Sequence, residues 1–247
     1  KDADFYIRVI VRNFKIYIPN NEKINTTNMI TNNNLGKYNS VINNFISELR
    51  NIEIQNDRFR FRKNLERLGE LFAYEISKTL EYKSETVTTP LGSIDMNVLK
   101  EQPVLATILR AGLPMHQGFL NIFDKADSAF IAAHRKYDKN ENFDVNIEYY
   151  SSTNINDKTL IIIDPMLSTG VSLVKCINDL LNEDMQPKEI HIANILASRE
   201  GIDYLKRSFG NKNITVWVGA IDEELTARAY IVPGLGDAGD LAYGRKE

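Results

Sequence analysis

The 247-residue chain has only one cysteine, Cys176, which excludes an internal disulfide framework and favours a reducing compartment. It also has no excess of basic residues. Lys and Arg number 30 against 33 Asp and Glu, so the net charge is near −3 and gives no electrostatic reason to expect bulk nucleic-acid binding. No apolar run approaches the roughly 18 residues of a membrane span, and no secretory signal precedes the body of the chain. These absences predict a cytoplasmic protein without membrane or nucleic-acid partners.

The first 28 residues read differently from the rest of the chain. Their stretch FKIYI, Phe14 to Ile18, alternates weakly like a strand, and the residues after it are rich in Asn and Thr. One interpretation is an added strand or hairpin, and another is a leader, with Met29 as the natural start. Neither suggests chemistry. We therefore expect an extension or leader over 1–28 and a single domain over 29–247.

Helical patterns dominate the chain between residues 41 and 76. Val41, Phe45 and Leu49 are spaced four apart, and Asp57 is a plausible cap for a second helix. The arginines of DRFRFRKNLER, residues 57–67, are interpreted as a solvated helix face or an oligomer contact rather than a ligand site. The apolar stripe of the second helix consists of Leu65, Leu68, Leu71, Phe72 and Ile76.

Short apolar runs alternate with helical patterns from residue 104 onward. Pro114 suits the first turn of the first of these helices. Because nearly continuous apolar strands separated by helices are typical of a parallel sheet covered on both faces, we predict an α/β fold with a parallel sheet flanked by helices. The expected strands are Val104–Leu109, Ser128–His134, Val145–Tyr150, Leu160–Ile163, Glu189–Ala197 and 214–221, and the expected helices are 112–123, Val171–Asn182 and 199–209.

The stretch DPMLSTGVS, residues 164–172, follows one of these strands and leads into a helix. Ligands of an open parallel sheet bind outside the carboxyl ends of its strands, where Asp164 is expected. A helix N-terminus binds phosphate, Ser168 and Thr169 add hydroxyl donors, and Gly170 lets the backbone approach closely. An ionised carboxylate would accept hydrogen bonds from ribose hydroxyls. The pattern therefore predicts a ribose 5-phosphate pocket, and the alternative is simple helix capping by Ser or Thr with a solvated Asp164.

Basic residues follow two other predicted strands. Arg110 ends one strand and precedes a Gly-containing turn, where a guanidinium is placed for bidentate contact with a phosphate or diphosphate. Arg135 and Lys136 begin a polar stretch without strand or helix pattern, which is typical of a mobile lid with a charge at its root. Either arginine alone would more often be a surface partner of a carboxylate.

The stretch YIVPGLGDAGDLAYG, Tyr230 to Gly244, is too rich in glycine to form a regular element. Glycines at positions 234, 236 and 239 would free the backbone to present its own N–H and C=O groups to a flat ligand. The edge of uracil reads acceptor, donor, acceptor, and an irregular backbone can offer the complement. The alternative is an ordinary C-terminal loop.

These motifs, DPMLSTGVS, ILRAG and YIVPGLGDAGD, resemble the signatures of the uracil phosphoribosyltransferases. The likeness runs roughly from Met29 to Arg245 and includes DRFR before the long helix and VGAIDEELTARAYIVPGLGDAGD near the end. It implies a type I phosphoribosyltransferase core with a C-terminal hood over the base. It also implies transfer of ribose 5-phosphate from 5-phosphoribosyl 1-diphosphate (PRPP) to N1 of uracil, which gives UMP and diphosphate.

The resemblance also implies residue roles at the matching positions. Arg110 and Arg135 would serve the diphosphate, and Asp237 would face both the donor and the base. These three would be the catalytic residues. PRPP would also contact Asp164, Pro165, Met166, Leu167, Ser168, Thr169, Gly170, Val171 and Ser172, and uracil would contact Ile231, Gly236, Asp237 and Ala238.

Three positions depart from the family pattern. Val171 replaces the second glycine of the usual TGGS, so the turn must allow a helical start there. Leu241 stands where a basic residue is common after GDAGD, and Pro114 stands where glycine commonly follows ILRAGL. None of these changes removes a proposed ligand group.

The expected chemistry is attack of uracil N1 on the anomeric carbon while diphosphate leaves. Mg²⁺ would arrive with PRPP and be held mainly by substrate and water, because no dedicated cluster of carboxylates is evident. Asp237 is a weak candidate for a general base, whereas His116, His134 and His191 are interpreted as structural. We expect a homodimer or higher homo-oligomer.

Two alternative functions stay open at this stage. A regulator that keeps this fold but binds RNA would need a basic face, and the acidic chain has no obvious one. The weaker alternative is an enzyme that uses a different base.

Overall fold

The computed structural model describes residues 31–137, 143–151, 153–181, 185–210 and 212–245, with side chains described except over 133–150. Residues 1–28, with their alternative interpretations, therefore lie outside the described residues, as does Met29.

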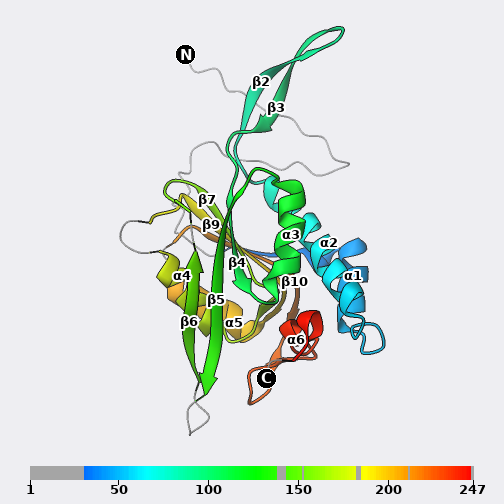
Figure 1. Cartoon of the computed structure of the whole chain (residues 1–247), viewed down its shortest axis with the longest axis vertical. Coiled ribbons are helices and arrows are strands. Elements are labelled where there is room, and N and C mark those ends of the chain that lie inside the picture. Colours follow the sequence, from blue (N-terminus) through cyan, green and yellow to red (C-terminus); the bar gives the residue numbers. More distant parts are fainter. Residues whose placement is uncertain (1–30, 138–142, 152, 182–184, 211, 246–247) are drawn as a thin grey trace, which may run out of the picture.

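A single eight-stranded sheet forms the centre of the molecule (Figure 1). Neighbouring strands run parallel, except for the antiparallel pair at the edge formed by β5 and β6. The predicted parallel sheet is thus confirmed, with one antiparallel edge strand. The strand order is β1 (Thr31–Asn34), β10 (Ile214–Asp222), β9 (Glu189–Ser198), β7 (Thr159–Ile163), β4 (Val104–Leu109), β5 (Asp127–Tyr137) and β6 (Phe143–Ser151), and β8 (Met166–Leu167) also pairs with β9.

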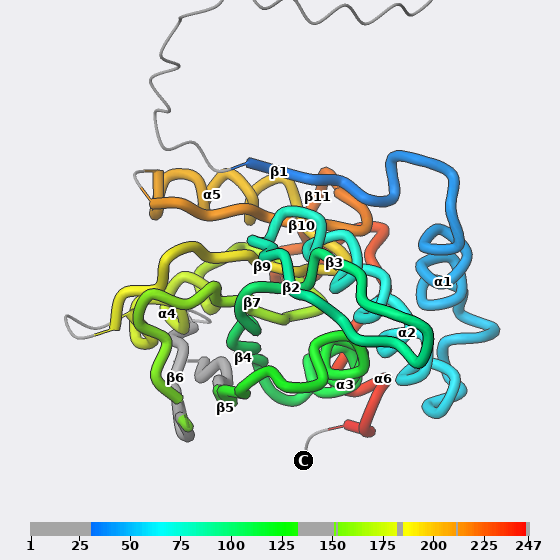
Figure 2. The backbone as a smooth tube through the Cα atoms, turned by 90° about the horizontal axis from the view of Figure 1, so that it is seen from above, coloured from blue at the N-terminus to red at the C-terminus, as the bar shows by residue number. Residues whose placement is uncertain are grey.

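Helices cover both faces of this sheet, as Figures 1 and 2 show. One face carries α1 (Val41–Arg50), α2 (Arg58–Ser77) and α3 (Gly112–Ile122), and the other carries α4 (Val171–Leu180) and α5 (Arg199–Phe209). Because successive strand residues point to opposite faces, the apolar strands feed two separate cores. Leu105 and Ile161 pack under the first group of helices, and Val104 and Leu160 under the second.

The two N-terminal helices confirm the predicted pattern only in part. The Asp57 side chain accepts a hydrogen bond from the Arg60 N–H at 3.0 Å, so the expected cap of α2 is confirmed. In α1, however, Ile42, Ile46 and Leu49 are buried, whereas Val41 is 53% exposed. The predicted stripe (Val41, Phe45, Leu49) and the buried one (Ile42, Ile46, Leu49) both have helical spacing. The packing of α1 on the sheet and on α2 buries the second, which is shifted by one residue at its first two positions.

The β5–β6 hairpin corrects the predicted lid at Arg135. Strand β5 continues through Arg135 and Lys136 to Tyr137, and Arg135 pairs with Val145 of β6. The antiparallel neighbour β6 supplies main-chain hydrogen bonds to this part of β5, so the strand forms without alternating apolar and polar residues. The sequence from Arg135 onward therefore shows no strand pattern. Residues 138–142, which join the two strands, lie outside the described residues.

A second hairpin, formed by β2 (Tyr82–Thr89) and β3 (Gly92–Leu99), has no counterpart among the predicted elements. It projects from the body of the molecule in Figure 1, and nearly all of its residues are exposed. At its base Glu81 forms ion pairs with Lys100, at 2.9 Å, and with Lys188. These pairs connect the hairpin to the residue before β9, and hydrogen bonds from the two lysines lower the pKa of Glu81 to about 2.

The glycine-rich C-terminal stretch is more regular than predicted. We call residues Ile231–Gly244 the C-terminal segment; it contains β12 (Ile231–Val232), which pairs with β11 (Glu224–Leu225), and the short helix α6 (Ala238–Tyr243). Gly234 and Gly236 have φ of +54° and +94°, as their predicted freedom requires, but Gly239 lies inside α6. A 3₁₀ turn (Leu35–Lys37) completes the regular elements of the described chain. Within that part of the chain, no helix has both the length and the apolar character needed to cross a membrane.

Candidate active site

The strand order reverses at the carboxyl ends of β4 and β7. From β4 the chain passes through α3 to β5 on one side, whereas from β7 it continues through β9 to β10 on the other side. Ligands of open α/β sheets bind where the strand order reverses in this way. Thr107 of β4 pairs with Ile163 of β7, so Arg110 and Asp164 both lie just beyond this edge.

The turn over residues 164–172, which we call the Asp164 turn, ends at the N-terminus of α4. Gly170 is the N-cap residue in the left-handed conformation, with φ +82°, and no side chain caps the helix. The alternative of Ser or Thr capping is therefore wrong. The first N–H groups of a ten-residue helix stay available for an anion. Val171 is the first residue of α4, which fits the helical start expected there.

Parts of the Asp164 turn are committed to the fold. The Pro165 carbonyl accepts hydrogen bonds from the N–H groups of Ile195 and Leu196 at 2.9 and 3.0 Å, Met166 pairs with Leu196 in the β8–β9 ladder, and the Leu167 side chain is buried. Ser168 donates its hydroxyl hydrogen bond to the Ala229 carbonyl. Within the turn, the hydroxyl groups of Thr169 and Ser172 have no hydrogen-bond partner among the described residues.

Asp164 is held in place through its main chain. Its N–H donates to the Ala193 carbonyl at 3.2 Å, and its own carbonyl accepts from the Asn194 side chain at 2.6 Å. Asn194 is fully buried, so this contact fixes the end of β7 against β9. The carboxylate itself is half-buried and accepts a long hydrogen bond of 3.4 Å from the Met166 N–H.

The Arg110 side chain contacts the C-terminal segment beyond the end of β4. Its Nη2 donates to Asp240 Oδ1 at 3.1 Å and to the Gly244 carbonyl at 3.3 Å, while its Nε is buried and has no hydrogen-bond partner among the described residues. A Cβ added at Gly239 would lie 3.2 Å from Asp237 Oδ1 and 3.6 Å from Arg110 Nη2. The side chains of Arg110 and Asp237 therefore both lie next to Gly239. Leu109 pairs with Ala132, which places the backbone of Arg135 beyond the same edge.

The base-binding candidates lie on the C-terminal segment. Asp237 is the N-cap of α6, and its Oδ1 accepts from the Asp240 N–H at 2.9 Å. Gly236 and Asp237 are exposed, and no described residue accepts a hydrogen bond from the N–H groups of residues 236–238. The Ile231 side chain is only 5% exposed and belongs to the core, so its main chain is the part that can face a ligand.

Comparison with known proteins identifies the family of this chain. A family model for uracil phosphoribosyltransferase matches residues 38–245. The uracil phosphoribosyltransferase of Porphyromonas gingivalis is 54% identical over 212 residues, which cover 86% of this chain and 97% of that protein. The chain belongs to the uracil phosphoribosyltransferase family.

Two more distant matches extend this result. The uracil phosphoribosyltransferase of Sulfolobus acidocaldarius is 36% identical over 213 residues, covering 83% of this chain and 96% of that protein. The solved structure of the AQ2163 protein from Aquifex aeolicus superposes with a TM-score of 0.76 at 28% identity, covering 87% of this chain and 98% of that one.

The positions at which this uracil phosphoribosyltransferase family member departs from the usual motifs are accommodated in the fold. Pro114 is buried in the first turn of α3, where the missing N–H costs no helical hydrogen bond. Leu241 is partly buried against the core beneath α6. An apolar side chain at this position therefore contributes packing to that core.

Sequence reasoning missed several polar contacts that hold the C-terminal segment. The arginines of residues 57–67 are not simply a solvated face: Arg62 donates to the Ala242 carbonyl at 2.7 Å and lies over the Tyr243 ring. Arg50 and Asp222 contact Gly234, and Asp240 contacts Arg110. These partners are more than 100 residues apart, except for Asp222 and Gly234, so no local pattern could reveal them.

The histidines confirm the structural interpretation where they are described. His116 is buried, its Nε2 lies 3.1 Å from Ser128 Oγ, and burial lowers its pKa to about 4. His191 lies within β9 and accepts a hydrogen bond from Trp217 Nε1 at 3.1 Å. The side chain of His134 is outside the described residues.

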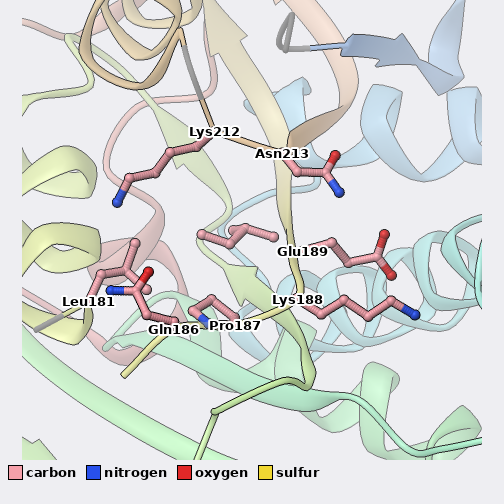
Figure 3. Close-up of a pocket in the computed structure, with 8 residues that line it drawn as sticks. Leu181, Gln186, Pro187, Lys188, Glu189, Lys212 and Asn213 are labelled. Carbon is pink, nitrogen blue, oxygen red and sulfur yellow. The ribbon is translucent and has the colours of Figure 1, made fainter. Parts of the chain in front are cut away.

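A small pocket lies at the opposite end of the sheet, where β9 and β10 begin (Figure 3). Lys188 and Glu189 line it at the start of β9, and Lys212 and Asn213 line it just before β10. At about 130 Å³ it is smaller than ordinary ligand pockets, and it is far from the carboxyl edge that carries Asp164 and Arg110.

Proposed function

We propose that this protein transfers ribose 5-phosphate from PRPP to N1 of uracil, giving UMP and diphosphate in pyrimidine salvage. One observation carries the proposal. Three features lie beyond the carboxyl ends of β4 and β7: a helix N-terminus suited to phosphate, the Arg110 guanidinium, and a segment with main-chain N–H groups that have no acceptor among the described residues. Each of the three chemical parts of the reaction, donor phosphate, leaving diphosphate and base, thus has a matching set of groups.

The donor's ribose 5-phosphate would bind at the Asp164 turn. Its oxygens would accept from the first N–H groups of α4 and from the hydroxyls of Thr169 and Ser172. The Asp164 carboxylate would accept from the ribose hydroxyls, and the buried Asn194 keeps it at the end of β7. Ser168 would join this set only by exchanging its hydrogen bond to Ala229 for one to the phosphate.

The base would bind against the main chain of residues 236–238. Uracil offers carbonyl acceptors on either side of its N3–H donor, and exposed main-chain N–H groups are suited to the carbonyls. Asp237 lies within reach of both ligands because it caps α6 beside Arg110.

The chemical step separates charge between the two halves of the donor. Oxocarbenium character develops on the ribose as diphosphate leaves, and negative charge grows on the leaving oxygens. Arg110 and Arg135 would stabilise that charge electrostatically. Arg110 can do so while keeping Asp240, because a guanidinium has five N–H donors and the Asp240 and Gly244 contacts engage only Nη2.

The metal proposal follows from the donor set. No group of three or more His, Cys, Asp or Glu side chains in the described ranges is placed to hold a metal ion. The residues present fit Mg²⁺ that enters with PRPP and is held mainly by diphosphate oxygens and water. When bound, the ion would neutralise charge on the leaving group.

Parallel assays test the proposed reaction. Release of diphosphate from PRPP is measured with uracil, cytosine, orotate and hypoxanthine, with and without Mg²⁺. Uracil should give a kcat/KM at least about 100-fold above the other bases, because mismatched buried polar groups are costly. Turnover with hypoxanthine or orotate in preference to uracil would contradict the proposal.

We further propose that the enzyme is a cytoplasmic homo-oligomer. The free thiol of Cys176 is buried, which is compatible with a reducing compartment. On one face of the β2–β3 hairpin Val87 pairs with Ile94, and Met96 lies two residues further along β3, opposite Glu85. The side chains of Val87, Ile94 and Met96 are 39%, 55% and 49% exposed. An isolated two-stranded hairpin is marginally stable in water, so a second copy of the chain is a suitable cover.

Light scattering tests the oligomer. The unmodified protein should have at least twice the monomer mass, and Val87→Ser combined with Ile94→Ser should lower that mass. A monomeric unmodified protein, or an unchanged mass in the double variant, would exclude the hairpin as the interface.

A further inference from the structure

A buried network joins α1, β10 and the C-terminal segment. Arg50, the last residue of α1, forms a fork with Asp222, the last residue of β10: Nη1 lies 2.8 Å from Oδ2 and Nη2 lies 2.8 Å from Oδ1. Arg50 Nη1 also donates to the Gly234 carbonyl at 3.1 Å, and the Gly234 N–H donates to Asp222 Oδ2 at 3.0 Å. Both main-chain groups of Gly234 are thereby held by one ion pair.

The conformation of Gly234 also restricts its position. Gly234 has φ +54°, and a Cβ there would lie 2.1 Å from the Ile231 carbonyl oxygen, so the turn closes tightly on itself. The next residue, Leu235, is 5% exposed and packs in the core. Only Leu235 separates Gly234 from the proposed base-binding residues Gly236, Asp237 and Ala238.

The network is placed to hold geometry rather than to touch a substrate. Asp222 is 8% exposed and the Arg50 side chain 23%, and the three hydrogen bonds accepted by the Asp222 carboxylate all come from Arg50 and Gly234. A planar guanidinium facing a carboxylate in a fork fixes both position and angle, which a lysine ammonium cannot do. The C-terminus of α1 is itself fixed, because Gln55 donates to the Leu49 carbonyl at 2.9 Å.

We propose that Arg50 and Asp222 are positioning residues for base selection, which act by fixing the main chain that reads uracil. This inference rests on the proposed function. Recognition by main-chain groups cannot be adjusted by a side-chain rotamer, so its accuracy depends on where the chain enters the loop. Loosening Gly234 should therefore weaken uracil binding and relax discrimination against cytosine, while the donor groups at the Asp164 turn are left alone.

Arg50→Lys tests this inference, because it keeps the charge beside buried Asp222 but removes the fork and the bond to Gly234. Replacing Arg50 by an uncharged residue would leave a buried carboxylate unpaired and could unfold the protein. The matched control is Arg60→Lys. Arg60 forms the same kind of fork, but with Glu48 of α1, at 2.8 and 2.5 Å, rather than with a residue that holds Gly234.

Steady-state kinetics provide the first measurement. In Arg50→Lys the KM for uracil should rise about tenfold or more, and the uracil-to-cytosine ratio of kcat/KM should fall about tenfold, since charged hydrogen bonds position the loop. The KM for PRPP should stay within about twofold of the unmodified value in both variants. Equal changes in the two KM values, or equal behaviour of the Arg50 and Arg60 variants, would overturn the inference.

Hydrogen exchange of the ligand-free proteins provides the second measurement, and it does not depend on activity. The amide of Gly234, whose N–H donates to Asp222 Oδ2, should exchange faster in Arg50→Lys and in Asp222→Asn than in Arg60→Lys or the unmodified protein. Unchanged exchange in both network variants would overturn the inference even if uracil is the substrate. If the unmodified protein does not use uracil, the proposed function fails, and the base-selection role fails with it.

Discussion

The Arg110 guanidinium and the Asp240 carboxylate form an ion pair of 3.1 Å between residues 130 positions apart in the chain. Arg110 directly follows β4, and Asp240 lies in α6 of the C-terminal segment. The pair therefore links the side of the site that would bind diphosphate to the side that would bind the base. A substitution of Asp240 should therefore alter the position of Arg110 and, through it, the use of PRPP.

Asp240→Asn should lower kcat/KM for PRPP by up to about fivefold. Both side chains of the pair are about one third exposed, at 34% and 35%, so solvent screening limits its contribution to about 1 kcal/mol. Steady-state kinetics with saturating uracil measure the effect. Glu75→Gln, which breaks the exposed Lys78–Glu75 pair on α2, is the control and should leave kcat/KM unchanged. Identical kinetics in both variants would show that Asp240 does not position Arg110.

Asp164→Asn should raise the dissociation constant of PRPP about 10- to 100-fold, because it removes the charge that would accept from ribose hydroxyls. The fold should persist, since the contacts to Ala193 and Asn194 use the main chain of Asp164 and not its side chain. Calorimetry measures the affinity, and the melting temperature checks the fold. An unaltered dissociation constant would remove Asp164 from the donor site.

Ala238→Pro should sharply reduce uracil use, because it deletes a main-chain N–H proposed to face the base. Ala238 is the first residue of α6 and follows Asp237 in an extended conformation, so proline is compatible with this position. Ala238→Ser keeps the N–H and should leave the uracil-to-cytosine ratio of kcat/KM nearly unchanged. A proline variant that used uracil normally would rule out the Ala238 N–H as a reader of the base.

His116 should make the free energy of unfolding depend on pH between its two pKa values. Burial lowers the folded-state pKa from 6.5 to about 4. Between these values the unfolded chain binds more protons than the folded one, so stability is highest above about pH 6.5 and falls as the pH drops towards 4, by up to about 1.4 kcal/mol per pH unit.

Urea unfolding at several pH values in this window measures that slope. His116→Gln removes the titrating ring and should flatten the pH dependence relative to the unmodified protein. The same slope in both proteins would mean that other groups, and not His116, bind the extra protons on unfolding.

The sequence by itself determined the alternation of the main strands and helices from residue 104 onward and the local chemistry of the Asp164 turn. Runs such as Leu160–Ile163 are long and apolar enough to fix a buried strand, and Asp57 marks a helix start, because these signals act between residues a few positions apart. The site motifs are equally local, since a strand end, a glycine N-cap and a helix start are consecutive.

Tertiary structure alone decided which face of α1 is buried, that β5 extends through Arg135, and that a separate β2–β3 hairpin projects from the sheet. It also decided the pairs Arg50–Asp222 and Arg110–Asp240. These features depend on the register of strands and the docking of helices. Charged groups far apart in the chain come into contact only when the strands have paired in the correct order. A periodic pattern over a few residues therefore cannot predict these contacts.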